Sequence, residues 1–411
     1  MDLSRFSRAQ RLLVAGGALL ILGAAVVGVW LLVMPIGTFP KFFDLESYRA
    51  TLNAVANGAL MYDWLGYPPV TLILLSPLRG LPELAGDQLW TGTSILMVLG
   101  LAAALSKLAM DTHRTTPGRA PTSFLTSFGL VGTLLLLSEP VYDNLLNGQL
   151  SLLVLTLAFL DAAGVLPRKW QGTLVGLAAA FKLTPLIFFP YYLITRQWRQ
   201  AGVATASFAA ATGLGFALFP NDSLYFWTHT DSSGRLGTDR MLNLSVLGSL
   251  SRWMADPAQA KLVWYGLALV LGLAALWRAW RHFRRGEQVE AALVVGCASV
   301  AISPISWPHY QIWLVLAAVW LLISGSRRTV RLGALIYVLY CPIFALPIAH
   351  AIVGLDDQPQ AVIPRVLWEL LVLVPVLICV LGLPRRDPRG RSESEADTDS
   401  SSPRTSIAVV S

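Results

Sequence analysis

GTLVGLAAAFKLTPLIFFPYYLIT, residues 172–195, is an apolar stretch with a single lysine near its middle and a proline three residues after it. It either crosses a membrane once or forms two short segments, residues 172–182 and 185–195, that break at the sequence KLTP. Two segments return the chain to its starting side, whereas one crossing inverts everything downstream. Lys and Arg decide between the two because cytoplasmic loops are enriched in these residues. With two segments the downstream Lys and Arg divide 14 to 5 in favour of the N-terminal side, so we predict two segments.

The whole chain has the composition of an integral membrane protein. Of its 411 residues, 55% are hydrophobic and only 13% are charged, whereas about a quarter of the residues in a soluble domain carry charge. Several apolar runs approach the roughly 20 residues that a helix needs to cross a bilayer. We therefore predict an all-α integral membrane protein with about 12 transmembrane segments. The candidate spans are residues 12–34, 88–110, 123–138, 149–166, 172–182, 185–195, 201–219, 262–280, 289–304, 310–324, 332–350 and 363–383.

Charge and cysteine usage exclude other classes of protein. The net charge of +7 follows the membrane topology and therefore does not indicate binding to nucleic acid. The first apolar run is too long for the core of a signal peptide and lacks a convincing small-residue cleavage site, so we predict an uncleaved anchor. The three cysteines all lie inside apolar runs, which gives no disulfide framework.

The predicted organisation is one transmembrane domain, residues 1–383, followed by a disordered polar tail, residues 384–411. Both termini are expected in the cytoplasm of a multi-pass plasma-membrane protein. Two large loops, residues 35–87 and 220–260, and three short ones near residues 139–148, 305–309 and 351–362 then lie on the external, periplasmic side.

The first external loop contains DLESYRATLNAVANG, residues 44–58, which has helical character and a glycine as a plausible stop. On a juxtamembrane helix Asp44, Tyr48 and Thr51 share one face. Glu46 points elsewhere, toward Arg49, and we expect those two to pair. Asp44 is then free for a functional site; the alternative is that it caps the helix.

Further polar islands interrupt the apolar sequence. MYDWLGYPP, residues 61–69, suits a rigid turn before a half-helix, or an aromatic anchor at the interface. NGQLS, residues 147–151, begins a span on the outer side, and the alternative is that it serves only as a turn and helix start. SPISWPHYQIW, residues 303–313, brings a histidine and a tyrosine to an outer helix end, where a lone His is usually structural. Lys182 would cost about 2.5–3.5 kcal/mol inside a membrane, so we favour a functional role over snorkelling.

Together these blocks resemble glycosyltransferase family 87, the integral-membrane, C-type glycosyltransferases of actinobacteria. FFDLESYRA is similar to the family's aspartate-bearing first external loop. MYDWLGYPP, NGQLS, GLAAAFKLTP, LNLSVLG and SPISWPHY then match further blocks in the same order. The likeness covers residues 40–325, and it is greatest to the polyprenyl-phosphate-mannose-dependent α-1,2-mannosyltransferases that elongate phosphatidylinositol mannosides and lipomannan.

The resemblance implies an inverting mannosyltransferase that uses no cofactor and no metal ion. Mannose would pass from polyprenyl-phosphate-mannose to a glycolipid acceptor at the bilayer surface. Asp44 would act as the base that takes the proton of the acceptor hydroxyl. Lys182 and His309 would stabilise the departing lipid phosphate.

The predicted site residues fall into two groups. Asp44 and His309 are the expected catalytic residues. The expected substrate-binding residues are Tyr48, Tyr62, Tyr67, Asn147, Gln149, Lys182, Asn243, Ser245, Trp307 and Tyr310.

Two alternatives stay open at this stage. An arabinofuranosyltransferase that uses polyprenyl-phosphate-arabinose is the nearest enzymatic rival. The chain departs from close mannosyltransferase relatives at Leu244, Ser151 and Tyr310, which leaves the exact acceptor open. A transporter or flippase of lipid-linked sugars would also carry an intramembrane lysine and broken helices, but we find no internal repeat of the kind such proteins contain.

Overall fold

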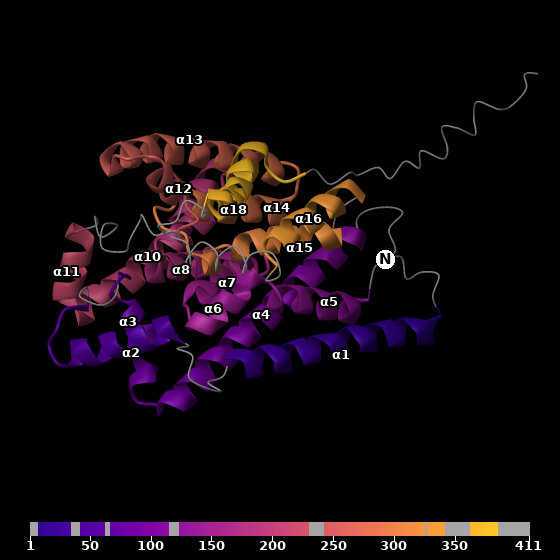
Figure 1. The fold of residues 1–411 in the computed structure, drawn as a ribbon, viewed down its shortest axis with the longest axis horizontal. Coiled ribbons are helices and arrows are strands. Elements are labelled where there is room, and N and C mark those ends of the chain that lie inside the picture. The colour runs from indigo at the N-terminus through magenta and orange to yellow at the C-terminus, as the bar shows by residue number, and fades with distance from the viewer. Residues whose placement is uncertain are drawn as a thin grey trace, which may run out of the picture.

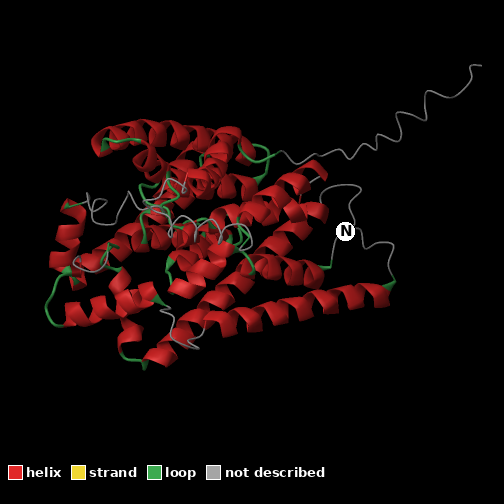
Figure 2. Ribbon diagram, in the orientation of Figure 1, coloured by secondary structure: helices red, strands yellow, loops and turns green. Residues whose placement is uncertain are grey.

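Figures 1 and 2 show the computed structural model, which describes residues 7–33, 42–61, 66–114, 123–229, 242–324, 327–341 and 362–384. Within these ranges every regular element is a helix, in agreement with the all-α prediction. The predicted tail falls almost entirely outside the described residues. The α-helices of the first half are α1 (Arg8–Val33), α2 (Phe43–Ala56), α3 (Thr71–Leu75), α4 (Glu83–Arg114), α5 (Phe124–Leu136), α6 (Glu139–Asn147), α7 (Ser151–Ala162), α8 (Thr173–Phe181), α9 (Phe188–Ile194) and α10 (Trp198–Leu218).

The second half continues the helical architecture, and short 3₁₀ helices join several of the longer elements. The remaining α-helices are α11 (Pro220–Thr228), α12 (Val246–Trp253), α13 (Pro257–Phe283), α14 (Gln288–Ile302), α15 (Ile312–Ser324), α16 (Arg327–Leu339) and α18 (Val362–Leu381). The 3₁₀ helices are η2 (Ser76–Arg79), η3 (Arg168–Trp170), η4 (Thr184–Ile187) and η6 (Pro308–Tyr310).

The predicted spans all overlap helices, but the helices differ in length. Among the described residues, α1, α4, α10 and α13 are each long and apolar enough to cross a membrane. α5 and α6 together would add a fifth crossing, although the chain bends by 64° between them. α7, α9 with η4, α14, α15 and part of α18 are apolar but shorter. The chain is therefore a multi-pass membrane protein, whereas twelve full crossings remain a prediction.

One predicted short loop is in fact helical. α6 occupies most of the stretch near residues 139–148 that was expected to be an external connection. Pro140 lies in its first turn, where the missing amide costs no hydrogen bond. Gly148 ends the helix with a φ of +67°. Apolar run length missed α6 because polar side chains such as Asp143 and Asn147 interrupt its sequence.

The centre of the molecule is formed by helices that are buried on every side. All residues of α14 from Val289 to Ala301 and of α15 from Ile312 to Leu321 are buried. Figure 1 shows α1 along one side of the molecule and α13 along the other, with α7, α8, α14 and α15 between them. α1, α10 and α13 expose large apolar side chains at their outer surfaces, as expected of helices that face lipid.

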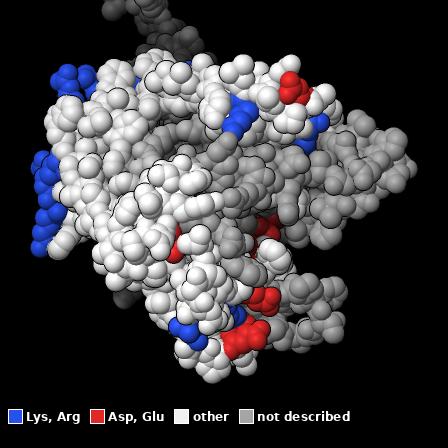
Figure 3. Space-filling view, turned by 90° about the vertical axis from the view of Figure 1, so that its left-hand side faces the viewer, with Lys and Arg blue, Asp and Glu red and all other residues white. Residues whose placement is uncertain are grey.

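Helices α2, α3 and α11 lie together at one end of the molecule, opposite the end at which α1 begins (Figure 1). α2 confirms the helix predicted in the first external loop, and Gly58, with a φ of +86°, follows its end. Asp222 of α11 fixes the chain after α2, because its carboxylate accepts a hydrogen bond of 2.8 Å from the Met61 amide. Figure 3 views this end, where much of the described surface is uncharged and acidic and basic side chains meet near its lower margin.

Candidate active site

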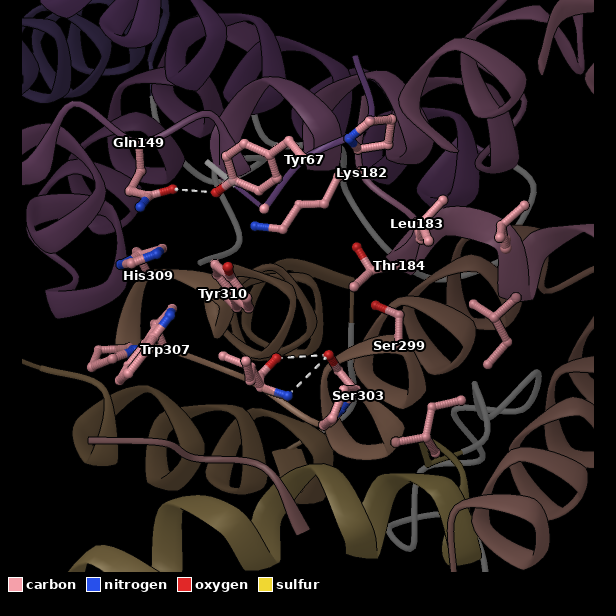
Figure 4. Close-up of a pocket in the computed structure, with 18 of the residues that line it drawn as sticks. Tyr67, Gln149, Lys182, Leu183, Thr184, Ser299, Ser303, Trp307, His309 and Tyr310 are labelled. Atoms are coloured by element: carbon pink, nitrogen blue, oxygen red, sulfur yellow. Dashed lines mark hydrogen bonds between the residues drawn. The ribbon is translucent and has the colours of Figure 1, made fainter. Parts of the chain in front are cut away.

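A cavity of about 1050 Å³ lies between α2, the end of α6, the break after α8, and η6 (Figure 4). Most of the predicted site residues line it together, although they come from segments that are far apart in the sequence. The predicted residues found in its wall are Asp44, Tyr48, Tyr67, Asn147, Gln149, Lys182, Trp307, His309 and Tyr310. Tyr62 lies outside the described residues.

The position of Asp44 is set by the packing of α2 against the end of α6. The Phe42 amide donates a hydrogen bond of 2.8 Å to the Leu146 carbonyl oxygen just before α2 begins. At Gly148 a Cβ would lie 2.7 Å from the Cβ of Leu45, so only glycine allows this close approach. Phe42, and not Asp44, is the N-cap residue of α2, and no side chain caps the helix. The alternative that Asp44 is a helix cap is therefore wrong.

The surroundings of the Asp44 carboxylate act on its pKa in opposite directions. Burial raises the pKa above its ordinary value of 3.8, and the negative charge of Asp143 acts in the same direction. Electrostatic interactions with His309 and Lys182 and a hydrogen bond from Gln149 lower it. The pKa is raised on balance, which makes this carboxylate a stronger base than an exposed aspartate.

The direction predicted for Glu46 is confirmed, but its predicted pair with Arg49 is replaced by another. Glu46 is exposed on the opposite side of α2, as its helical phase predicts. Arg49, however, pairs with Asp87 of α4 at 2.7 Å and donates a second hydrogen bond to the Glu83 carbonyl oxygen. The expected pair with Glu46 is therefore replaced by one that joins α2 to α4, because a partner on a neighbouring helix is within reach.

Lys182 lies where the predicted break in residues 172–195 occurs. α8 ends at Phe181, and Lys182 has an extended backbone with a φ of −154°. Its ammonium donates a hydrogen bond of 2.9 Å to the Ser151 hydroxyl and lies 3.4 Å from the centroid of the Tyr310 ring. The Tyr67 ring centroid is 5.3 Å away. Within the described part of the chain no carboxylate forms an ion pair with it, so the charge is available to a bound anion.

His309 faces the cavity from η6 with one ring nitrogen held and the other open. Nδ1 is 2.8 Å from Oδ2 of Asp143 on α6. Nε2 is buried and has no hydrogen-bond partner among the described residues. Figure 4 shows His309 beside Tyr310, at the same part of the cavity as Gln149. Of the two ring nitrogens, Nε2 is therefore the one without a protein partner among the described residues.

A group of hydroxyls surrounds the Gln149 side chain. Its Oε1 accepts hydrogen bonds from the Tyr48 hydroxyl over 3.3 Å and from the Tyr67 hydroxyl over 3.4 Å. Burial raises the pKa of Tyr67 to about 12, so this hydroxyl stays protonated and can donate. The Leu150 amide donates to the Tyr48 hydroxyl over 3.4 Å. These long hydrogen bonds can be exchanged for bonds to a polar ligand.

Asn243 and Ser245 lie behind the cavity wall and are not among its lining residues. The Asn243 amide donates to the Pro304 carbonyl oxygen over 3.0 Å and accepts from the Ser306 amide over 2.9 Å. The Ser245 hydroxyl donates to the same carbonyl and accepts from the Gly248 amide at the start of α12. The two residues are therefore engaged in positioning the segment that leads to η6, and this differs from the substrate contact that was predicted.

Sequence reasoning did not identify Asp143 and Ser151 as members of the site. Ser151 was considered only as a departure from the resembled family. Asp143 lies four residues before Asn147, which donates a hydrogen bond of 2.9 Å to it. That i, i+4 spacing on a helix was the available signal, but α6 itself was not predicted.

The far side of the cavity is apolar and reaches the outer surface of the bundle. Leu186 and Ile187 of η4 line it opposite α13. Leu269 and Leu273 of α13 line it as well, yet they are 64% and 60% exposed. The cavity is therefore polar near α2 and η6 and opens between helices toward the surface that would face lipid.

The arrangement combines a carboxylate of raised pKa, a buried ammonium and an open imidazole nitrogen in one cavity with an apolar side. These groups suit proton removal from a hydroxyl and stabilisation of a developing anion. Within the described residues no three His, Cys, Asp or Glu side chains are grouped so as to hold a metal ion. That no metal takes part stays a prediction.

The fold and the cavity define the class of protein. It is a multi-pass helical membrane protein whose cavity contains ionisable side chains and also opens toward the surface that would face lipid. Residues 64–304, more than half of the chain, match the sequence profile of Glycosyltransferase family 87. The chain belongs to this family, and it is therefore a glycosyltransferase. The family resemblance inferred from the sequence blocks is confirmed.

Named relatives of similar length agree with this assignment. The chain is 31% identical over 365 residues to a polyprenol-phosphate-mannose-dependent alpha-(1-2)-phosphatidylinositol mannoside mannosyltransferase of Mycobacterium tuberculosis, covering 82% of this chain and 85% of the relative. It is 28% identical to the enzyme of that name from Mycolicibacterium smegmatis, over 73% of this chain and 74% of the relative. A pentamannoside mannosyltransferase of the same species is 29% identical, over 74% and 75%. No solved structure matches the chain.

Proposed function

We propose that the protein transfers mannose from polyprenyl-phosphate-mannose to a lipid-linked mannoside, forming an α-1,2 linkage with inversion at the anomeric carbon. The observation that carries the proposal is the convergence of Asp44, Lys182 and His309 on one cavity with an apolar opening. The printed names of the relatives give the donor, the linkage and the class of acceptor. The acceptor of this chain is accordingly a phosphatidylinositol mannoside.

The chemistry follows from the charges that develop during transfer. The acceptor oxygen forms a bond to C1 of mannose as the bond between C1 and the phosphate oxygen breaks. Asp44 takes the proton of the acceptor hydroxyl, and its raised pKa suits it to that task. The departing lipid phosphate gains negative charge, which the Lys182 ammonium and a proton on His309 Nε2 stabilise.

Inversion requires the base and the leaving group to lie on opposite sides of C1. Asp44 comes from α2, whereas Lys182 comes from the break after α8, and both line the same cavity. A sugar ring between them would meet Tyr48, Tyr67 and Gln149, whose hydroxyl and amide groups already exchange hydrogen bonds. These groups would fix the ring by its hydroxyls.

The apolar side of the cavity would receive the isoprenoid chain of the donor. Leu269 and Leu273 lie both in the cavity wall and at the outer surface of α13, which permits entry from the bilayer. A lipid donor can then place its phosphate at Lys182 without leaving the membrane.

The orientation that we propose puts both termini in the cytoplasm and the cavity on the external face of the plasma membrane. α1 begins at the end of the molecule opposite α2, α3 and α11 (Figure 1). The 14 to 5 division of downstream Lys and Arg supports the same orientation. The product would enter the synthesis of cell-envelope glycolipids.

The deciding experiment supplies purified protein with radiolabelled polyprenyl-phosphate-mannose and a phosphatidylinositol mannoside acceptor in detergent. We expect a labelled glycolipid whose new sugar is released by an α-1,2-mannosidase. A parallel assay with polyprenyl-phosphate-arabinose should give no product. Transfer of arabinose in place of mannose would assign the protein to the arabinofuranosyltransferases, and movement of a lipid-linked sugar across vesicles without transfer would make it a transporter.

A further inference from the structure

Asp143 forms a contact that the proposed mechanism leaves unexplained. Its Oδ2 lies 2.8 Å from His309 Nδ1, and its Oδ1 accepts a hydrogen bond of 2.9 Å from the Asn147 amide nitrogen. The same amide nitrogen also donates to the Asp143 carbonyl oxygen over 2.9 Å, which closes one turn of α6. Both carboxylate oxygens of Asp143 are therefore engaged, one by its own helix and one by the histidine.

These contacts fix the direction of the hydrogen bond to His309. An ionised carboxylate can only accept hydrogen bonds, so the Nδ1 atom must carry the proton that it shares with Asp143. Asn147 donates to the other oxygen and thereby holds the carboxylate plane in place. Residues of α6 thus determine which tautomer His309 adopts.

The other ring nitrogen has the opposite character. His309 Nε2 is buried and has no hydrogen-bond partner among the described residues, although His309 lines the cavity with Lys182. A buried polar atom without a partner costs free energy, so a ligand atom at this place would recover it. The ring is therefore held at Nδ1 and left open at Nε2.

We propose that Asp143 is a positioning residue that holds the His309 ring with a proton on Nδ1 and Nε2 directed to the donor phosphate. When Nε2 is also protonated, the charge of the imidazolium is balanced by the Asp143 carboxylate, and Nε2–H donates to the leaving phosphate oxygen. This role rests on the proposed function, because it assigns the phosphate as the group that Nε2 meets. Asp143 itself need not touch the substrate.

α6 is suited to hold such a residue rigidly. Pro140 lies in its first turn, and Gly148 ends it in a left-handed conformation. The Glu139 amide donates a hydrogen bond of 2.8 Å to the Tyr340 carbonyl oxygen, which ties the start of α6 to the end of α16. The end of α6 also carries Asn147 and faces α2, so α6 positions the base and the histidine together.

The first test is spectroscopic and needs no turnover. The chain has five histidines, so ring-¹⁵N-labelled protein gives few signals, and His309→Gln assigns one of them. In the wild-type protein we expect His309 Nδ1 to be protonated and hydrogen-bonded over a wide pH range. In Asp143→Asn the acceptor is a neutral amide oxygen, so that signal should move to the shift of a weaker hydrogen bond or of an unprotonated Nδ1. A bare Nδ1 in the wild-type protein overturns the proposal, whatever the variants do.

The second test is a double-mutant cycle in the transfer assay. Asp143→Asn should lower kcat by roughly 10- to 10⁴-fold, the range seen when a carboxylate that orients a functional histidine is removed. In a His309→Gln background the same change should cost almost nothing, because its target is gone. If the losses of kcat in the two single variants multiplied in the double variant, Asp143 would act independently of His309, and the proposal would be overturned.

A matched control separates this effect from damage to a helix. Asp256 accepts hydrogen bonds from the Ala258 and Gln259 amides at the start of α13, and Asp256→Asn keeps an acceptor oxygen there. That variant should transfer mannose at the wild-type rate. Asp143→Glu should recover part of the rate and of the ¹⁵N shift if the carboxylate is what matters. If the wild-type protein transfers no mannose, the proposed function fails, while the ¹⁵N spectra still decide the role of Asp143.

Discussion

The Phe42 amide donates a hydrogen bond of 2.8 Å to the Leu146 carbonyl oxygen, and this contact joins the start of α2 to the end of α6. It brings a helix from the first loop against a helix that follows α5, and it places Asp44 over the cavity that Gln149 also lines. The proposed base therefore depends on two segments about a hundred residues apart in the sequence.

Replacing the proposed base should remove transfer without unfolding the protein. Asp44→Asn keeps the size and one acceptor oxygen of the side chain but cannot take a proton. We expect transfer to fall by about 10²–10⁴-fold while the thermal unfolding temperature in detergent changes little. Glu46→Gln is the matched control, because Glu46 is exposed on the same helix. If Glu46→Gln lost activity and Asp44→Asn kept it, the assignment of the base would be wrong.

The pH dependence of transfer should reflect the raised pKa of Asp44. The base works only when it is deprotonated, so the rate falls as the pH drops through its pKa. Because burial raises that pKa above 3.8, kcat/KM should begin to fall at a higher pH than a free aspartate would give. Initial rates across a pH series, with stability checked at each pH, measure this. A rate that held constant down to pH values near 3.8 would contradict the role of Asp44.

The sequence could predict those parts of the site that depend on residues close together along the chain. It could not predict contacts between residues that are far apart in the sequence. The phase of α2 follows from a local pattern, so Asp44, Tyr48 and the outward direction of Glu46 were predictable. The break at Lys182 was also local, because a proline follows it closely. The pair between Arg49 and Asp87 was not, since it depends on how α2 packs on α4.

α6 shows most clearly what the sequence could not predict. Its sequence mixes polar and apolar residues, so it resembles a loop when only apolar runs are counted. Asp143 was missed for this reason, and its contact with His309 joins positions that no periodic pattern connects. Asn243 shows the opposite case, a residue that was predicted to contact substrate but lies behind the cavity wall. It is polar and lies in a block that matches the family, yet its side chain bonds to the backbone of residues 304–306.

Filling the apolar side of the cavity should weaken the binding of long-chain donors. Gly272 lines the cavity, and the nearest atom to a Cβ there is Ile302 Cδ1 at 3.9 Å. A larger side chain therefore has room to enter the space proposed for the isoprenoid chain. Gly272→Phe should raise the KM for a long-chain polyprenyl-phosphate-mannose several-fold and leave a short-chain donor almost unaffected.

The control for this change lies on the same helix. Gly266 is exposed, and a Cβ there meets no atom within 4 Å, so Gly266→Phe adds the same ring outside the cavity. Its KM values should match those of the wild-type protein. If Gly272→Phe raised the KM of short-chain and long-chain donors equally, the isoprenoid chain of the donor would bind elsewhere.

The proposed orientation can be measured by labelling single cysteines in a background without Cys297, Cys341 and Cys379. Glu46→Cys lies at the exposed surface of α2 and should react with a membrane-impermeant thiol reagent in intact cells. Arg285→Cys, exposed after the end of α13, should react only after the membrane is opened. Reaction of Arg285→Cys in intact cells would overturn the interpretation of residues 172–195 as two segments.

The charge that stabilises the leaving group should come from the protein and not from a metal ion. A nucleotide diphosphate usually needs a divalent cation to absorb its charge, but the proposed leaving group is a lipid monophosphate. Lys182 can supply that charge, since its ammonium is held by Ser151 and by the face of the Tyr310 ring. Lys182→Met keeps the apolar stem and should lower transfer by roughly 10²–10³-fold, chiefly through use of the donor, while Lys182→Arg keeps part of the activity. Wild-type transfer should persist in excess EDTA. Loss of turnover in EDTA that added magnesium or manganese restores would mean that a metal ion supplies the charge, and Lys182 would then need another role.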